Sequence, residues 1–233
     1  MYRAGLSLLV AATLAGCVET TTVPSAPVTA PVSRSSGPGL TTTDFQRVVS
    51  RVEPVAERQC RREAQEANCD FKIVLETDPR APSNAWQTLD DRGRPVLTFT
   101  SALLKDVQND DELAFIMGHE AAHHISGHIS RTQQTALTGA ILGGILVSAM
   151  GGDANAVSSA RDIGATVGAR RYSKDYELEA DRLGTVISYH AGYDPLRGAA
   201  YFTRIPDPGD QFLGSHPPNG QRIETVRRTM ATL

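Results

Sequence analysis

The sequence predicts an α+β domain that is mainly helical and carries a small β-sheet. Two observations lead to this prediction. Helix-like segments, one of them with a capping box, occupy most of the chain, and three short strand-like runs are grouped after the first of them. The chain has 233 residues, a formal net charge of −3 and no basic stripe, so a nucleic-acid partner is not expected. Residues 41–233 suit one domain with a substantial core.

Residues 1–16 are typical of a secretory signal peptide. Arg3 supplies the positive start, and the apolar run that follows is too short to span a bilayer as a permanent helix. The segment ends in Leu-Ala-Gly before Cys17, which resembles a bacterial lipobox, where that cysteine carries lipid. An ordinary signal peptide with a chance cysteine is the alternative. Because Val18 is not the aspartate of an inner-membrane retention signal, we expect a lipid anchor in the outer membrane of a Gram-negative bacterium, facing the periplasm.

The N-terminal half of the domain is predicted to hold the sheet. It follows a tether over residues 17–40, which is rich in Thr, Pro, Ser and Val and is expected to be disordered. A helix is predicted over residues 44–66, with an interruption at Pro54. Three short strands are predicted over residues 71–76, 84–89 and 95–100.

Cys60 and Cys69 are candidates for a disulfide, because an exported protein meets an oxidising compartment. Nine residues along one helix separate two Cα atoms by about 13.5 Å, whereas a disulfide needs less than about 7 Å. If the two cysteines pair, the helix must end near residues 67–68 and the chain must fold back. Two free thiols are the alternative.

Helices are predicted to follow the strands. After a short helix over residues 101–107, Asn109 caps a helix expected to run from about residue 110 to residue 134, with Glu112 placed as in a capping box. The remaining helices are predicted over residues 174–190, from Pro195 onward, and over residues 217–232.

Residues 136–151 form an apolar, glycine-rich run that is short for a membrane span. A buried segment, a mobile flap over the site and a membrane-contacting loop are the three interpretations. We favour the first two, because several glycines weaken a free-standing helix.

Four of the six histidines lie in one stretch of eleven residues, GHEAAHHISGH. At about 100° per helical residue, His119 and His123 share one face with Glu120 beside them. The pattern is H-E-x-x-H, in which two imidazoles bind zinc and the glutamate lies next to the metal-bound water. His124 and His128 turn away on an intact helix, and we interpret them as core or supporting residues. A structural histidine pair is the alternative.

A catalytic zinc ion needs a third protein ligand and an open position. The longer metzincin motif is absent, because Ser126 and Ile129 stand where it needs glycine and histidine. In the segment YELEADRLG, Glu177 and Asp181 share one helix face, whereas Glu179 points away. We expect Glu177 to be the third ligand and Asp181 to accept a hydrogen bond from a ligand histidine. A solvated helix face is the alternative.

HEAAHH followed by ELEADRLG resembles the M48 zinc metallopeptidases, which share H-E-x-x-H and a later E-x-x-x-D. NDDELAFIMGHE and SHPPNGQRI are weaker similarities to the same family, and the resemblance covers about residues 44–228. It implies a zincin-like fold and one zinc ion per chain, bound by His119, His123 and Glu177, with Glu120 as the general base.

His216 is expected at the metal centre, because a zincin needs a donor near the developing oxyanion. It lies in GSHPPNG, where Pro217 and Pro218 restrict the backbone. It would donate to the oxyanion or occupy the open position in a resting, self-inhibited enzyme, and Arg222 would stabilise the same charge. A purely structural loop histidine is the alternative.

These features predict a zinc metalloendopeptidase of the bacterial envelope. Its expected substrates are unfolded or misassembled periplasmic and outer-membrane proteins, in quality control, held by strand addition to residues 84–86. The rival hypothesis is a lipid-anchored assembly or holdase factor with a structural zinc ion and little proteolysis. The presence of Glu120 argues against it, because a structural site does not need that carboxylate. A peptidoglycan-acting zinc hydrolase ranks last.

Overall fold

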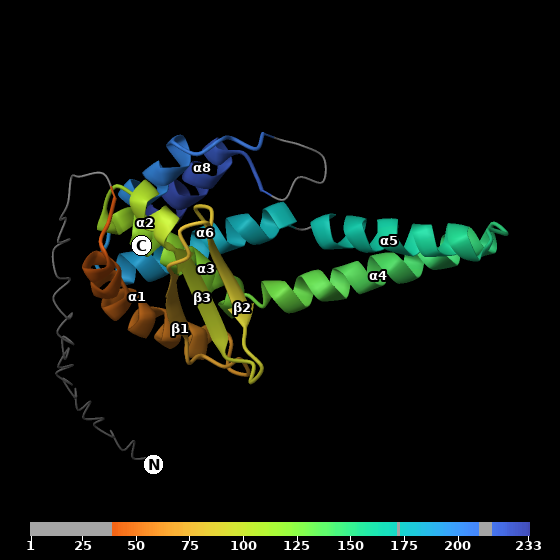
Figure 1. Cartoon of the computed structure of the whole chain (residues 1–233), viewed down its shortest axis with the longest axis horizontal. Coiled ribbons are helices and arrows are strands. Elements are labelled where there is room, and N and C mark those ends of the chain that lie inside the picture. The colour runs from red at the N-terminus through yellow and green to blue at the C-terminus, as the bar shows by residue number, and fades with distance from the viewer. Residues whose placement is uncertain (1–38, 172, 210–215) are drawn as a thin grey trace, which may run out of the picture.

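The computed structural model describes residues 39–171, 173–209 and 216–233 (Figure 1). The predicted signal peptide, Cys17 and all but the last two residues of the predicted tether lie outside this part of the chain.

The described chain is mostly helical with one three-stranded sheet, so the predicted α+β class is confirmed. The strand order is β1-β3-β2, with β1 parallel and β2 antiparallel to β3. The elements are α1 (Thr42–Glu63), β1 (Lys72–Glu76), β2 (Ala85–Leu89), β3 (Pro95–Thr100), α2 (Ser101–Asp106), α3 (Asp110–Ile125), α4 (His128–Ala149), α5 (Ala154–Arg171), α6 (Ser173–His190), α7 (Pro195–Ala199), the 3-10 helix η1 (Ala200–Thr203) and α8 (Asn219–Met230).

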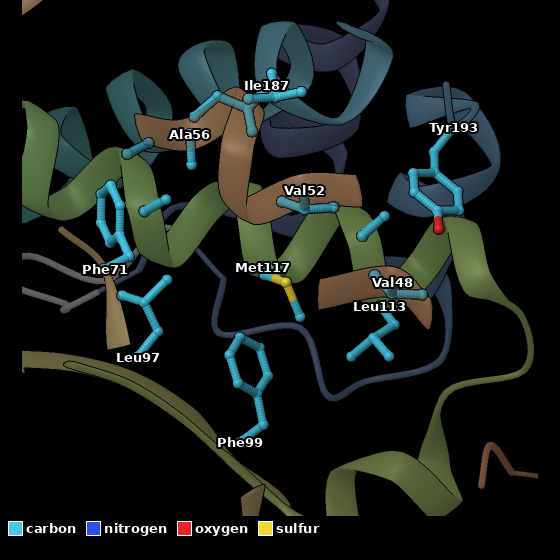
Figure 2. Packing of buried hydrophobic residues seen from close by; sticks show 14 of the residues in the cluster. Val48, Val52, Ala56, Phe71, Leu97, Phe99, Leu113, Met117, Ile187 and Tyr193 are labelled. Carbon is cyan, nitrogen blue, oxygen red and sulfur yellow. The ribbon is translucent and has the colours of Figure 1, made fainter. Parts of the chain in front are cut away.

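The core holds α3 between α1, α6 and the sheet. Met117 of α3 points toward Phe99 of β3, and Val48 and Val52 of α1 pack nearby (Figure 2). All four side chains are fully buried, which stabilises the fold by about 1.5–3 kcal/mol for each large one. This packing fixes the helix that carries the histidines.

The N-terminus of α3 is anchored by three buried acidic residues, each of which meets an arginine of another segment. Asn109 caps the helix as predicted, accepting a hydrogen bond from the backbone N–H of Glu112 at 3.1 Å. Negative charge at a helix N-terminus is also favoured by the helix dipole. The three ion pairs are Asp110 with Arg47, Asp111 with Arg197, and Glu112 with Arg204.

The first helix runs through Pro54, so the predicted interruption is wrong. Pro54 is exposed, and water can therefore serve the carbonyl that the proline leaves unpaired. The helix ends at Glu63 and the chain folds back. Cys60 and Cys69 form a disulfide in the structure, with their Cα atoms 5.6 Å apart.

The helix predicted over residues 110–134 is in fact two helices. The first ends at Ile125 and the second begins at His128, because Gly127 adopts a left-handed conformation with a φ of 64°. A glycine in this conformation is a common helix stop. The break changes the direction of the chain immediately after the histidine motif (Figure 1).

The prediction that residues 136–151 are buried or form a flap over the site is wrong. They continue α4, and α5 returns beside it, so the two helices project from the body as a hairpin (Figure 1). Leu137, Leu142 and Leu146 are each more than 60% exposed there. Within the described residues, no helix combines the length and the apolar character needed to cross a membrane.

Candidate metal centre

The site is built where α3 and α6 cross at Gly118 and Gly184. A methyl group on Gly184 would lie 2.8 Å from the backbone nitrogen of His119, and one on Gly118 would lie 2.8 Å from the carbonyl oxygen of Gly184. Two glycines therefore allow the two backbones to touch. This close crossing brings Glu177 and Asp181 of α6 against the histidines of α3.

The three side chains predicted as zinc ligands lie together. The Nε2 atoms of His119 and His123 are 3.0 Å apart, and the carboxylate oxygens of Glu177 lie 3.6 Å and 3.3 Å from them respectively. Zinc bonds of about 2.0–2.1 Å in tetrahedral geometry require ligand atoms about 3.3–3.4 Å apart. The observed distances bracket this spacing, so the donor set fits a zinc ion.

Asp181 supports His119 from behind. Its Oδ1 atom is 2.9 Å from Nδ1 of His119, which leaves Nε2 facing Glu177. Asp181 is fully buried, and Arg222 donates to both of its oxygens, at 2.7 Å and 2.8 Å. Arg222 also lies 3.5 Å from Glu177, so it is part of the site, but its bidentate contact with Asp181 was not predicted from the sequence.

The pKa values of Asp181 and His119 are shifted by the protein groups that surround them. Burial raises the pKa of Asp181, but the charge and hydrogen bonds of Arg222 outweigh it and hold that pKa below its usual value. Burial lowers the pKa of His119, but hydrogen bonds to Asp181 and Glu177 outweigh it and raise that pKa to about 10. The proton on His119 must therefore leave before its Nε2 atom can bind a cation.

His123 is supported by another histidine. The Nδ1 atoms of His123 and His128 are 2.8 Å apart, and Nε2 of His128 lies 3.2 Å from a carboxylate oxygen of Glu179. The His128 ring stacks on Tyr176, with centroids 4.6 Å apart, and Arg131 donates to Glu179 at 2.8 Å. This contact was not predicted from the sequence, because on an unbroken helix His128 would face away, whereas the stop at Ser126 and Gly127 turns it back toward His123.

The hydrogen-bond roles in this chain follow from the chemistry. If Nε2 of His123 faces a cation, its Nδ1–H donates to Nδ1 of His128, whose Nε2–H donates to Glu179. Burial lowers the pKa of His128 to about 4, so its ring is neutral and can accept. His124 is separate, since its Nε2 lies 2.7 Å from the carbonyl oxygen of Asn68.

A cleft of about 710 Å³ opens beside these ligands. Glu120 lines it, and within the described chain no hydrogen bond or ion pair holds the carboxylate of Glu120. Residues 83–87, on and before the edge strand β2, line the same cleft. A free carboxylate and a strand edge therefore share one cavity with the candidate ligands.

His216 reaches the site from the segment before α8. Its Nδ1 atom lies 3.1 Å from Glu177, and its side chain is half exposed at the cleft. The structure thus brings together every residue predicted for the metal centre, although they extend over more than a hundred positions of the chain, from His119 to Arg222.

Comparisons with known proteins point to one family. The profile of peptidase family M48 matches residues 43–230. The mitochondrial metalloendopeptidase OMA1 of Saccharomyces cerevisiae is 27% identical over 168 residues, 68% of this chain and 46% of that protein.

Two bacterial relatives match over shorter stretches. The beta-barrel assembly-enhancing protease of Yersinia pestis is 26% identical over 140 residues, 54% of this chain and 29% of that protein. The metalloprotease LoiP of Escherichia coli is 26% identical over 135 residues, 55% of this chain and 53% of that protein. The chain spans between a quarter and about half the length of the curated relatives that it matches.

Proposed function

The chain belongs to peptidase family M48, and from this membership we propose that it is a zinc-dependent endopeptidase of the bacterial cell envelope. The observation that carries the proposal is the donor set of His119, His123 and Glu177, whose spacing fits tetrahedral zinc beside a cleft lined by Glu120. The fold places these four residues on two helices that are locked together, which favours a preorganised site.

The chemistry is peptide hydrolysis. When bound, zinc polarises the scissile carbonyl and lowers the pKa of water to about 7. Glu120 takes the proton of the attacking water and passes it to the leaving amine. Its carboxylate makes no hydrogen bond or ion pair within the described residues, so it is available for this transfer. Asp181 holds His119 in the tautomer that directs Nε2 to the metal.

Substrate is proposed to bind along β2. This strand is at the edge of the sheet and pairs only with β3 among the described strands. A peptide that adds to such an edge gains main-chain hydrogen bonds without a sequence requirement. Because residues 83–87 line the cleft, the added peptide would pass beside Glu120 and the zinc ligands.

We also propose how the chain is anchored in the envelope and which proteins it cleaves. We retain residues 1–16 as the signal peptide, Cys17 as the lipid-carrying residue, residues 17–40 as the tether and residues 41–233 as the catalytic domain. The substrates are unfolded or misassembled envelope proteins, which is supported by relatives named as beta-barrel assembly-enhancing proteases. The holdase alternative leaves the unpaired Glu120 carboxylate in the cleft without a purpose.

The proposal is tested with Glu120→Gln. This variant keeps the shape of the residue but removes the base, so we expect full zinc content and loss of nearly all hydrolysis of an unfolded protein substrate. Glu66→Gln, at an exposed carboxylate outside the cleft, is the matched control and should keep full activity. Cleavage by the Glu120→Gln enzyme at the unaltered rate would refute the base assignment and favour the holdase.

A further inference from the structure

The hairpin of α4 and α5 concentrates the exposed apolar surface of the molecule. Eight of the eleven exposed large hydrophobic side chains in the described residues lie on it or at its tip. They are Leu137, Ile141, Leu142, Ile145, Leu146, Met150, Ile163 and Val167. Such a concentration on a projecting element marks an interaction surface rather than scattered surface residues.

The packing of the hairpin is inverted relative to a hairpin in water. Its seam is made of small residues, and a Cβ atom on Gly139 or Gly164 would overlap the carbonyl oxygen of the other. Gly143 meets Ala160 in the same way. Water-soluble helix pairs bury large apolar residues between them, whereas helices in lipid pack through small residues and direct large ones outward.

Charge is also distributed as lipid contact requires. No charged residue occurs from position 132 to position 152, which covers nearly all of α4 and the tip. On α5, Ser158 and Asp162 are exposed and lie opposite Ala160 and Gly164, the positions that face α4. One charged side chain, Arg161 of α5, lies against Gly144 of α4. A long arginine side chain can keep its stem on an apolar surface while its guanidinium extends toward polar headgroups. The hairpin therefore has an apolar side formed by α4, with Arg161 at its border, and a polar side formed by the outer face of α5.

The shape of the apolar surface indicates whether lipid or a second protein chain covers it. One group, of Leu137, Ile141 and Ile145, borders a hollow of about 660 Å³ that Val157 and Arg161 of α5 also line. A second group, which includes Leu142 and Leu146, borders a groove of about 590 Å³ between the two helices. A second copy of the chain would cover one of these surfaces and leave the other in water, whereas fluid acyl chains cover both.

We propose that this hairpin docks the protein on a lipid bilayer, lying within one leaflet with α4 toward the acyl chains and the outer face of α5 toward the headgroups. The apolar part of α4, from Leu137 to Met150, is about 20 Å long, more than the ~15 Å of one leaflet, which favours a tilted or in-plane position. The surface exists whether or not the chain is a peptidase, so the proposal does not rest on the proposed function.

Docking would also orient the cleft. Ile129, Thr132 and Gln133, at the root of α4, line the cavity that holds the candidate ligands. The mouth of that cavity would lie within about 35 Å of the bilayer, the length of α4.

The test is flotation of residues 17–233 carrying Cys17→Ala with vesicles of phosphatidylethanolamine and phosphatidylglycerol. This chain lacks the apolar run of the predicted signal peptide, and the substitution removes the predicted lipid anchor, so binding reports on the folded protein. We expect the chain to float, and adding Leu142→Glu and Leu146→Glu to lower the bound fraction by more than about tenfold. Both leucines are more than 60% exposed, so the folded state tolerates the change. Leu196→Glu, at an exposed leucine of α7, is the matched control and should float normally.

A fluorescent label tests the orientation. With Cys17 replaced and Cys60 bonded to Cys69, an introduced cysteine is the only free thiol, since the chain has three cysteines. A dye on Ile145→Cys should shift to shorter wavelength with vesicles, whereas one on Ser158→Cys should not. The proposal is overturned if the chain does not float, if the hairpin and Leu196 variants float equally, if the two labels respond alike, or if the glutamates instead convert a dimer to a monomer in sedimentation.

Discussion

At the scale of single residues, the two candidate ligand histidines have different supports. His119 contacts an ionised carboxylate that Arg222 holds in place, whereas His123 contacts the neutral ring of His128. A carboxylate acceptor raises the basicity of the imidazole that it binds more than a neutral acceptor does. His119 is therefore expected to be the stronger zinc ligand of the pair. For His123, the main contribution of His128 is expected to be the orientation of the ring.

The role of His128 can be tested through zinc affinity. His128→Leu removes the acceptor for the Nδ1–H of His123, and we expect zinc affinity to fall by about tenfold or more. His128→Gln restores an acceptor and should recover part of this loss. Affinity is measured by competition with a chromophoric chelator. His124→Gln is the control, because the ring of His124 bonds to the backbone of Asn68 and packs against Phe71. Equal affinity in the leucine variant and the unaltered chain would show that His128 only packs.

Two proposed roles of His216 can be separated by kinetics. Its contact with Glu177 places it beside the candidate ligands, where it would either donate to the oxyanion or block the open position. In His216→Ala, loss of an oxyanion donor lowers kcat by about 10²–10³, whereas loss of an inhibitory ligand raises activity. Steady-state hydrolysis of a fluorogenic peptide distinguishes the two. If kcat, KM and zinc affinity are all unchanged, His216 does not belong to the site.

At the scale of elements, local sequence patterns correctly predicted the features that are determined by residues close together in the chain. The i, i+4 spacing of His119 and His123 fixes their shared face on any intact helix, and the Asn109 cap fixes where that helix begins. Strand alternation likewise predicted all three strands to within one residue. These features depend on local geometry, so the sequence was sufficient for them.

The wrong predictions concern segments in which two sequence signals compete. Apolar residues continue past Ile125, which suggested a single helix, but the left-handed Gly127 ends it. The helical hairpin was not predicted, because its glycines were interpreted as residues that weaken a helix. In the structure these glycines allow α4 and α5 to pack closely against each other. No local pattern specifies which helix Gly118 will cross, so the supporting partners beyond Asp181 were not predicted.

The glycine crossing gives a test at this scale. Gly184→Ala places a methyl group 2.8 Å from the backbone of His119, so α3 and α6 must separate. We expect a loss of about 1–3 kcal/mol in the free energy of unfolding and weaker zinc binding, because Glu177 moves with α6. Denaturant unfolding and chelator competition measure the two effects. Gly220→Ala is the control, since a methyl group there meets nothing within 4 Å. A Gly184→Ala chain with both quantities unchanged would contradict the role of the crossing.

At the scale of the whole molecule, the site lies where segments from four parts of the chain meet. The edge of the sheet forms one wall of the cleft, α3 and α6 supply the ligands, and the start of α8 supplies Arg222. The hairpin projects from the body (Figure 1), and Ile129, Thr132 and Gln133 at its root line the cleft. The proposed substrate-binding edge, the candidate metal centre and an apolar projection are thus arranged around one helix, α3, which is packed in the core.

A zinc ion at this position would bridge α3 and α6 and should stabilise the whole fold. Only the folded chain brings both helices together, so zinc at a thousand times its Kd adds about 4 kcal/mol to the free energy of unfolding. For a domain of this size that corresponds to a rise in Tm of roughly 10 °C, measured by calorimetry before and after chelation. His123→Ala removes one ligand and should show little rise at the same zinc concentration. An equal rise in both chains would place the stabilising ion elsewhere, and no rise in the unaltered chain would refute the bridge between the two helices.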